Sequence, residues 1–269
     1  MSAAHLIGMV GAGGVARALS RALSARGWRV APIDSRAPLG GARTLLIAVA
    51  DDALAEVAAA LAKVYSTGDG VALHTSGAHG PEILAPLAAK GFDCGTLHPL
   101  QTISDSNSDV LEGVAFAISG GKKAIAFAEQ IVADLGGRAL HIRPEQRAMY
   151  HAAAVMASNY ITALIHAAEQ LLQLAGVTGP EARRALSPLI RQSVENSLEQ
   201  GPAKALTGPI RRGDAGTVAV HLAALRSAPG SLEELYRACG MVTVDVAREG
   251  GLAADLALQI ETLLKCTTL

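Results

Sequence analysis

Seven short apolar runs lie within the first 142 residues, and no comparable run follows them. They span 6–10, 29–33, 44–49, 70–74, 93–97, 114–118 and 138–142. Helical patterns at 14–26, 52–64, 80–90 and 121–135 separate most of these runs. Strands that alternate with helices are typical of βαβ units. The sequence therefore predicts an α/β domain whose mostly parallel, Rossmann-like sheet is covered by helices on both faces.

The pattern changes after residue 143. Helical periodicity continues to the end of the chain, over 145–175, 180–200, 214–227, 231–249 and 252–265. Pro144 suits a first helical turn, so we predict an α/β domain over 1–143 and an all-α domain over 144–269. The first of these helices is long for a small bundle, which favours a central helix or a homodimer interface.

Composition excludes several classes of function. The formal net charge is −1 in 269 residues, so no basic surplus points to nucleic acid or to an anionic membrane. No stretch approaches the uninterrupted apolar length of a membrane span. The three cysteines are scattered, which predicts reduced thiols in a cytoplasmic protein. Eight histidines show no HExxH or HxH spacing, so we expect no metal site.

The first apolar run leads into the stretch GAGGVA at 11–16, which reads GxGxxA and opens a helical pattern. In this motif Gly11 permits a tight turn, Gly13 lets a pyrophosphate approach the backbone, and small Ala16 lets the helix pack on the sheet. A helix N-terminus also favours negative charge. We therefore predict a dinucleotide phosphate site on Gly11, Ala12, Gly13, Gly14 and Val15; the alternative is a glycine turn without a ligand.

The second run ends in Asp34-Ser35-Arg36, which carries two conflicting signals. Asp34 suits the ribose hydroxyl of NAD, whereas Arg36 suits the 2′-phosphate of NADP, to which Ser35 can also donate. Because a guanidinium binds phosphate in a fork, we expect NADP, with NAD as the alternative. Asp34 can equally be a plain turn residue. Only 34–43 joins the second and third runs, which is short for a parallel crossover and predicts a missing or reduced helix.

Several motifs together resemble one bacterial family. They are GMVGAGGVARAL, IAVADDALAEVAAAL, VALHTSGAHGPEIL, GTLHPLQTI, YHAAAVMASNY and LTGPIRRGD, and the likeness covers essentially the whole chain. The family comprises Rossmann-like oxidoreductases with a C-terminal helical domain of unknown function. Its relatives in the 6-phosphogluconate-dehydrogenase-like superfamily are pyrroline-5-carboxylate reductase, ketopantoate reductase and deazaflavin-dependent NADP oxidoreductase. The resemblance implies a nicotinamide cofactor and homodimers packed through the C-terminal helices, but no single substrate.

Candidate site residues follow the strands, because ligands of open α/β sheets bind outside the carboxyl ends of the strands. Ala50 and Asp51 end the third run and are expected to contact the cofactor, although Asp51 also suits a helix N-cap. The resemblance places the segments of Ser76 and His98 beside the nicotinamide. We expect both side chains in cofactor binding and catalysis, and Gln101 in substrate binding; a structural role for each is the alternative.

The long helix pattern supplies Tyr150, His151 and Asn159. The ketopantoate reductase and hydroxyacid dehydrogenase relatives carry a lysine on the corresponding helix, and here His151 takes the lysine place and Asn159 that of an asparagine. An imidazole can supply a proton because its ordinary pKa lies near operating pH. We expect His151 and Asn159 to be catalytic and Tyr150 to bind substrate. The alternative is a histidine bonded within a helix interface.

The segment LTGPIRRGD and the following helix supply a second candidate group. Arg212 could bind a substrate carboxylate, with Asp214, Thr217 and His221 around it. A plain helix cap is an equally good reading of Asp214.

The sequence thus predicts an NAD(P)-dependent oxidoreductase that moves hydride between nicotinamide and a small carboxylated metabolite, a 2-oxo acid or a cyclic imine. The alternative is a non-catalytic, dimeric dinucleotide sensor, which the short 34–43 connection and the absent helix lysine favour.

Overall fold

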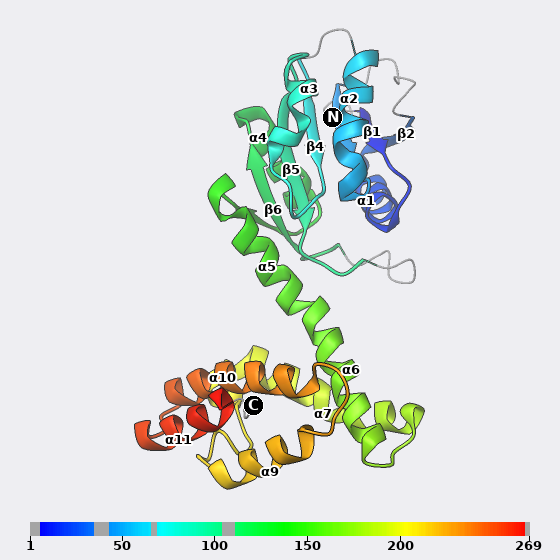
Figure 1. The fold of residues 1–269 in the computed structure, drawn as a ribbon. Coiled ribbons are helices and arrows are strands. Elements are labelled where there is room, and N and C mark those ends of the chain that lie inside the picture. Colours follow the sequence, from blue (N-terminus) through cyan, green and yellow to red (C-terminus); the bar gives the residue numbers. More distant parts are fainter. Residues whose placement is uncertain (1–5, 35–42, 66–68, 104–110, 267–269) are drawn as a thin grey trace. The chain divides into compact units, whose positions relative to one another are not determined.

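The computed structural model describes residues 6–34, 43–65, 69–103 and 111–266. The chain divides into two compact units, Met1–Asn159 and Tyr160–Leu269 (Figure 1). The last strand ends at His141, close to the change of pattern at 143. The division into units instead falls between Asn159 and Tyr160. The domain boundary at 143 therefore stays a prediction.

A seven-stranded sheet forms the centre of the first unit, as the apolar runs predict. Its strands are β1 (Leu6–Val10), β2 (Arg29–Ile33), β3 (Thr44–Ile47), β4 (Val71–His74), β5 (Asp93–Pro99), β6 (Ala115–Gly120) and β7 (Arg138–His141). Their order is β2-β1-β3-β4-β5-β6-β7, and every neighbouring pair is parallel except β5 and β6. The mostly parallel α/β fold is thereby confirmed.

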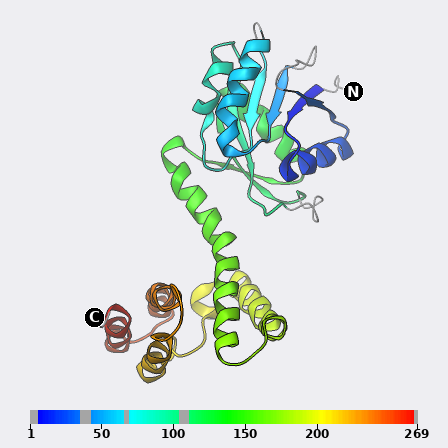
Figure 2. The same ribbon diagram turned by 45° about the vertical axis from the view of Figure 1, so that its right-hand side comes forward.

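Helices cover both faces of this sheet (Figures 1 and 2). They are α1 (Gly14–Ala25), α2 (Leu54–Val64), α3 (Ala85–Ala88) and α4 (Lys122–Asp134). Helices α1 and α4 share one apolar core with Leu73, while α2 and α3 share another with Ala72. Successive strand residues point to opposite faces. The central strands β1, β3 and β4 are therefore almost wholly apolar, because both of their faces are buried, whereas the edge strands β2 and β7 are partly exposed.

The strand order contains one reversal that matters for ligand binding. Strand β1 lies between β2 and β3, so the chain passes from β1 to one side and then crosses to the other. Ligands of doubly wound sheets bind at such a switch point, outside the carboxyl ends of the strands. Here that point lies between Gly11, which follows β1, and Ala48, which follows β3.

The region expected to form one helix over 145–175 contains two, so that expectation was wrong. A 3-10 turn at Pro144–Gln146 leads into α5 (Arg147–Ala157), and α6 (Asn159–Leu174) begins after Ser158. The backbone of Ser158 leaves the helical region at φ −125° and ψ −73°. Its hydroxyl lies 2.9 Å from the Thr102 hydroxyl.

The remaining helices belong to the second unit. They are α7 (Gly179–Gln200), α8 (Pro202–Ala205), α9 (Ala215–Leu225), α10 (Leu232–Glu249) and α11 (Ala254–Lys265). Helices α9, α10 and α11 lie side by side around a core that contains Val218, Val244 and Ile260, all fully buried. The all-helical C-terminal region is confirmed. In the described ranges, no helix combines the length and apolar character that crossing a bilayer requires.

Candidate functional site

The turn after β1 is built so that only glycine fits at its first position. Gly11 has φ +118°, a conformation that residues with a side chain rarely adopt. A Cβ atom there would lie 2.1 Å from the carbonyl oxygen of Ala48. Gly11 therefore lets the backbone pass against the end of β3, which is the tight turn that the motif predicts.

Gly13 leaves room where Gly11 does not. It is the N-cap of α1, and a Cβ on it would meet no atom within 4 Å. The first amides of a helix have no partner within the helix, and the first helical bond here is donated by the Arg17 amide to the Gly13 carbonyl. Open space next to helix-terminal amides fits a diphosphate.

Two of the other predicted cofactor residues lie at the same edge of the sheet. Ala50 and Asp51 are exposed at the carboxyl end of β3, where Asp51 begins the 3-10 turn that precedes α2. Ser35 and Arg36 lie outside the described residues. The choice of NADP over NAD, which depends on Arg36, therefore stays a prediction.

The loop after β4 is held by a buried histidine. His74 is fully buried, and its Nε2 donates to the Gly80 carbonyl at 3.0 Å while its Nδ1 accepts from the Ser76 amide at 3.2 Å. This pattern defines a neutral imidazole, and burial lowers the pKa of His74 to about 4. The Ser76 hydroxyl in turn accepts from the amides of Ala78 and His79. These bonds order the loop; a catalytic role for Ser76 stays a prediction.

His98 follows the same edge on β5 and contacts α5. Its Nδ1 lies 2.6 Å from the Tyr150 hydroxyl, and the two rings are almost perpendicular. Burial, with the nearby His151 and Arg147, lowers the pKa of His98 to about 4. Burial also raises the pKa of Tyr150 to about 12. The tyrosine therefore keeps its proton and donates to Nδ1, which leaves the proton of neutral His98 on Nε2.

His98 and His151 converge on Gly77. A Cβ on Gly77 would lie 2.8 Å from Nε2 of His98 and 2.7 Å from Nδ1 of His151. The His151 Nδ1 atom is buried and, in the described part of the chain, has no hydrogen-bond partner. Two imidazole nitrogens thus flank one backbone position, an arrangement that can hold and transfer a proton.

A cavity of about 270 Å³ adjoins these rings. Small apolar side chains of α5 and of the end of β5 form much of its wall. Four of the residues predicted from the sequence also line it, namely His98, Gln101, His151 and Asn159. Thr102 and Ser158 add two hydroxyl groups to the wall. The structure therefore brings the strand-end and helix candidates together around one small hollow.

Sequence reasoning missed Arg147, which is only 4% exposed. The signal was present: Arg147, Tyr150 and His151 are spaced to share one face of a helix that is otherwise rich in alanine. Arginine at a helix start usually lies in solvent, so its burial could not be read from the sequence.

The second candidate group belongs to the second unit. Asp214 caps α9, where its carboxylate accepts from the Thr217 amide at 2.9 Å and from the Thr217 hydroxyl at 2.6 Å. These hydrogen bonds lower the pKa of Asp214. His221 pairs with the Tyr236 hydroxyl at 2.8 Å. The capping alternative for Asp214 describes the observed contacts; substrate binding by this group and by Arg212 stays a prediction.

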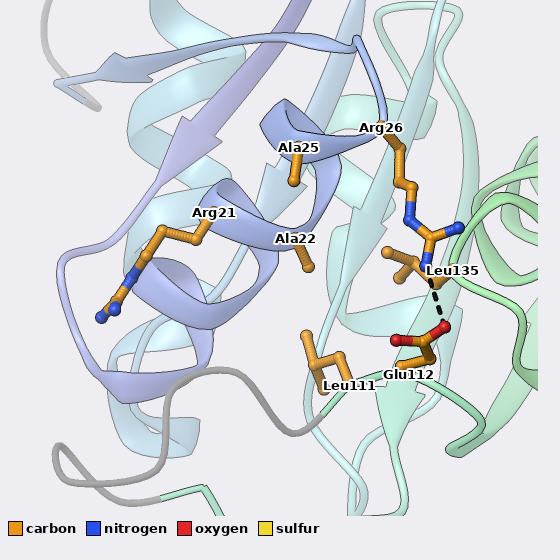
Figure 3. Close-up of a pocket in the computed structure, with 7 residues that line it drawn as sticks. All are labelled: Arg21, Ala22, Ala25, Arg26, Leu111, Glu112 and Leu135. Carbon is orange, nitrogen blue, oxygen red and sulfur yellow. Dashed lines mark hydrogen bonds and ion pairs between the residues drawn. The ribbon is translucent and has the colours of Figure 1, made fainter.

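A separate hollow of about 420 Å³ lies at the end of α1 (Figure 3). Two of its lining residues, Arg26 and Glu112, form an ion pair of 3.3 Å (Figure 3). A helix rises 1.5 Å per residue, so Arg26 lies roughly 20 Å along α1 from Gly13. This hollow is therefore separate from the phosphate cradle. Across the described ranges, no three His, Cys, Asp or Glu side chains gather as metal ligands would.

Acid should destabilise this protein through its buried histidines. An unfolded histidine takes up a proton near pH 6.5, whereas His74 and His98 in the folded chain do so only near pH 4. The unfolded state therefore binds more protons between these values, and the unfolding free energy falls as pH falls through them. We expect urea denaturation to show this loss between about pH 7 and about pH 5, and His74→Gln to reduce it. His141, which is exposed on β7, provides the control His141→Gln; an equal effect of both variants would contradict the assignment.

Comparisons with known proteins agree with this geometry. Residues 32–99 match the model of a Rossmann-like domain, and residues 114–243 match that of a domain of unknown function, DUF2520. The chain joins a Rossmann-like domain to a DUF2520 domain. The likeness predicted from the motifs is thereby confirmed. The DUF2520 match begins just before β6, so it includes α5 with Arg147, Tyr150 and His151. Among curated proteins none matches.

Solved structures show the same fold. A Bacteroides fragilis protein assigned as an NADP oxidoreductase is 22% identical, with a TM-score of 0.72 over 91% of this chain and 98% of the other. A Thermotoga maritima protein is 22% identical, with a TM-score of 0.73 over 90% and 98%. The Plasmodium falciparum pyrroline carboxylate reductase, crystallised with NADP bound, is 13% identical, with a TM-score of 0.58 over 96% and 99%. At these identities the likeness establishes the fold.

Proposed function

We propose that this protein is an NADP-dependent oxidoreductase that reduces a carbonyl or imine carbon of a small carboxylated metabolite. The observation that carries the proposal is the shared sheet edge, where the Gly11–Gly13 cradle and the imidazoles of His98 and His151 both lie. Strands are about 4.8 Å apart, so β5 lies roughly 10 Å beyond β3. A dinucleotide held by its diphosphate at β1 and β3 can reach the imidazole pair with its nicotinamide end.

The cofactor supplies the hydride in such a reaction, and the protein supplies its position and a proton. The amides of Gly13 and of the first turn of α1 would hold the diphosphate. Tyr150 orients His98 through Nδ1, so that the His98 proton stays on Nε2 beside His151. The volume of the cavity, about 270 Å³, limits the substrate to a compact molecule. His151 then delivers a proton to the reduced oxygen or nitrogen, with Asn159 at the cavity wall to orient the substrate.

Two observations support the finer parts of this proposal. The fold neighbour from Plasmodium falciparum binds NADP, which favours a nicotinamide cofactor here. Arg212 remains the proposed partner of a substrate carboxylate. A homodimer is retained because α5 and α6 expose large apolar side chains, among them Met149 at 77% and Leu164 at 44%.

The test is a calorimetric titration with NADPH, NADP⁺, NADH and NAD⁺, followed by NADPH oxidation with a panel of 2-oxo acids and cyclic imines. We expect binding of NADPH and turnover of at least one substrate class. Binding without turnover across the panel would instead favour the sensor, and failure to bind any of the four dinucleotides would contradict both functions.

A further inference from the structure

Arg147 is a buried positive charge whose partners are all uncharged. Its Nη2 donates to the hydroxyls of Thr96 at 3.0 Å and Ser119 at 2.5 Å, and its Nη1 donates to the Gly77 carbonyl at 3.4 Å. Its Nε has no hydrogen-bond partner in the described part of the chain. A buried charge whose hydrogen-bond partners are all neutral costs folding free energy. Its presence is better explained by what it does for neighbouring groups than by stability.

The guanidinium joins segments that the sheet brings together. Thr96 on β5 and Ser119 on β6 are directly paired in the antiparallel register, and their hydroxyls are 3.0 Å apart. Gly77 belongs to the loop after β4 and is the residue on which His98 and His151 converge. One side chain of α5 is therefore hydrogen-bonded to β5, to β6 and to the loop after β4.

The same anchor sets the rotation of α5. Residues three and four positions apart share a helix face, so Tyr150 and His151 follow the direction in which Arg147 points. With Arg147 directed into the sheet edge, the Tyr150 hydroxyl reaches Nδ1 of His98, and Nδ1 of His151 lies beside the position that a Cβ of Gly77 would occupy. A rotation of α5 would break both contacts.

We propose that Arg147 is a positioning residue, which fixes α5 so that Tyr150 and His151 face His98 and places a fixed positive charge beside the imidazole pair. Its role in turnover rests on the proposed function, whereas its effect on His98 can be measured in the ligand-free protein.

The charge acts on His98 together with other groups. His151 and His74 also disfavour a proton on His98, while Asp51 favours one. Glu82 is the carboxylate whose field acts on Arg147 itself. Removal of the Arg147 charge should therefore make His98 easier to protonate, although burial of the ring remains the larger cause of its low pKa.

The test is an NMR titration of the His98 ring in the ligand-free protein, with kcat and NADPH affinity measured on the same samples. Arg147→Met removes the charge and should raise the pKa of His98. Arg147→Lys keeps the charge and should leave that pKa nearer the original value. Both variants should lower kcat and leave NADPH affinity unchanged. Arg143→Met, four residues earlier and exposed, is the matched control and should change neither quantity.

A second variant separates anchoring from charge and covers the case in which Arg147→Met does not fold. Ser119→Ala keeps the guanidinium but removes one of its partners, so kcat should fall while the His98 pKa changes little. An unchanged His98 pKa in Arg147→Met, or an unchanged kcat in Ser119→Ala, would overturn the proposal. Loss of all dinucleotide binding in the unmodified protein would contradict the proposed function but would leave the titration result valid.

Discussion

Replacement of Gly13 by aspartate should weaken NADPH binding about a hundredfold without destabilising the protein. A carboxylate at this position would lie about 5 Å from the diphosphate, and at an effective dielectric constant of about 20 its repulsion is about 3 kcal/mol, or roughly two factors of ten in affinity. Stability should be unchanged or slightly higher, because Gly13 has an extended backbone, a Cβ there meets nothing within 4 Å, and aspartate is a favoured N-cap. Calorimetry and thermal denaturation measure the two effects.

Gly13→Asn is the control for this substitution, because asparagine has almost the same size and also caps helices but carries no charge. It should lose less affinity than Gly13→Asp. If both variants bind NADPH as tightly as the original protein, the diphosphate does not lie at this helix terminus.

Loss of either imidazole should remove most of the turnover. General acid catalysis contributes about a hundredfold to ten-thousandfold, so His151→Ala and His98→Ala should each lower kcat by a factor in that range. NADPH affinity should change much less. The two rings lie on β5 and α5, whereas the proposed diphosphate cradle lies in the turn after β1. Steady-state kinetics and calorimetry provide the two measurements.

The double variant His98→Ala/His151→Ala should have a kcat close to that of either single variant, because the effects of groups that act as a unit are not additive. His141→Ala serves as the control, since His141 is exposed on β7 and pairs with Glu129. Turnover that survives both His98→Ala and His151→Ala would remove the proton-transfer role from this pair.

Most of the fold could be predicted from local sequence. All seven strands coincide with the seven apolar runs to within two residues. For the central strands β1, β3 and β4 the reason is that a strand buried on both faces must be largely apolar. The glycine turn was predictable for a similar local reason, since its sequence motif requires a backbone that only glycine adopts at residue 11. Strand order and the antiparallel β5–β6 pair were not predictable, because pairing depends on contacts between distant segments.

The candidate site also has parts that the sequence predicts and parts that only the tertiary structure shows. The sequence by itself determined the glycine turn after β1 and the helix cap at Asp214, because each depends on residues a few positions apart. Only the tertiary structure decided that His98 meets Tyr150 and His151 at Gly77, that Ser158 ends a helix, and that Arg147 is buried. The physical reason is that burial and the pKa shifts that follow from it are set by neighbours from other strands, and no local pattern records which neighbours those will be.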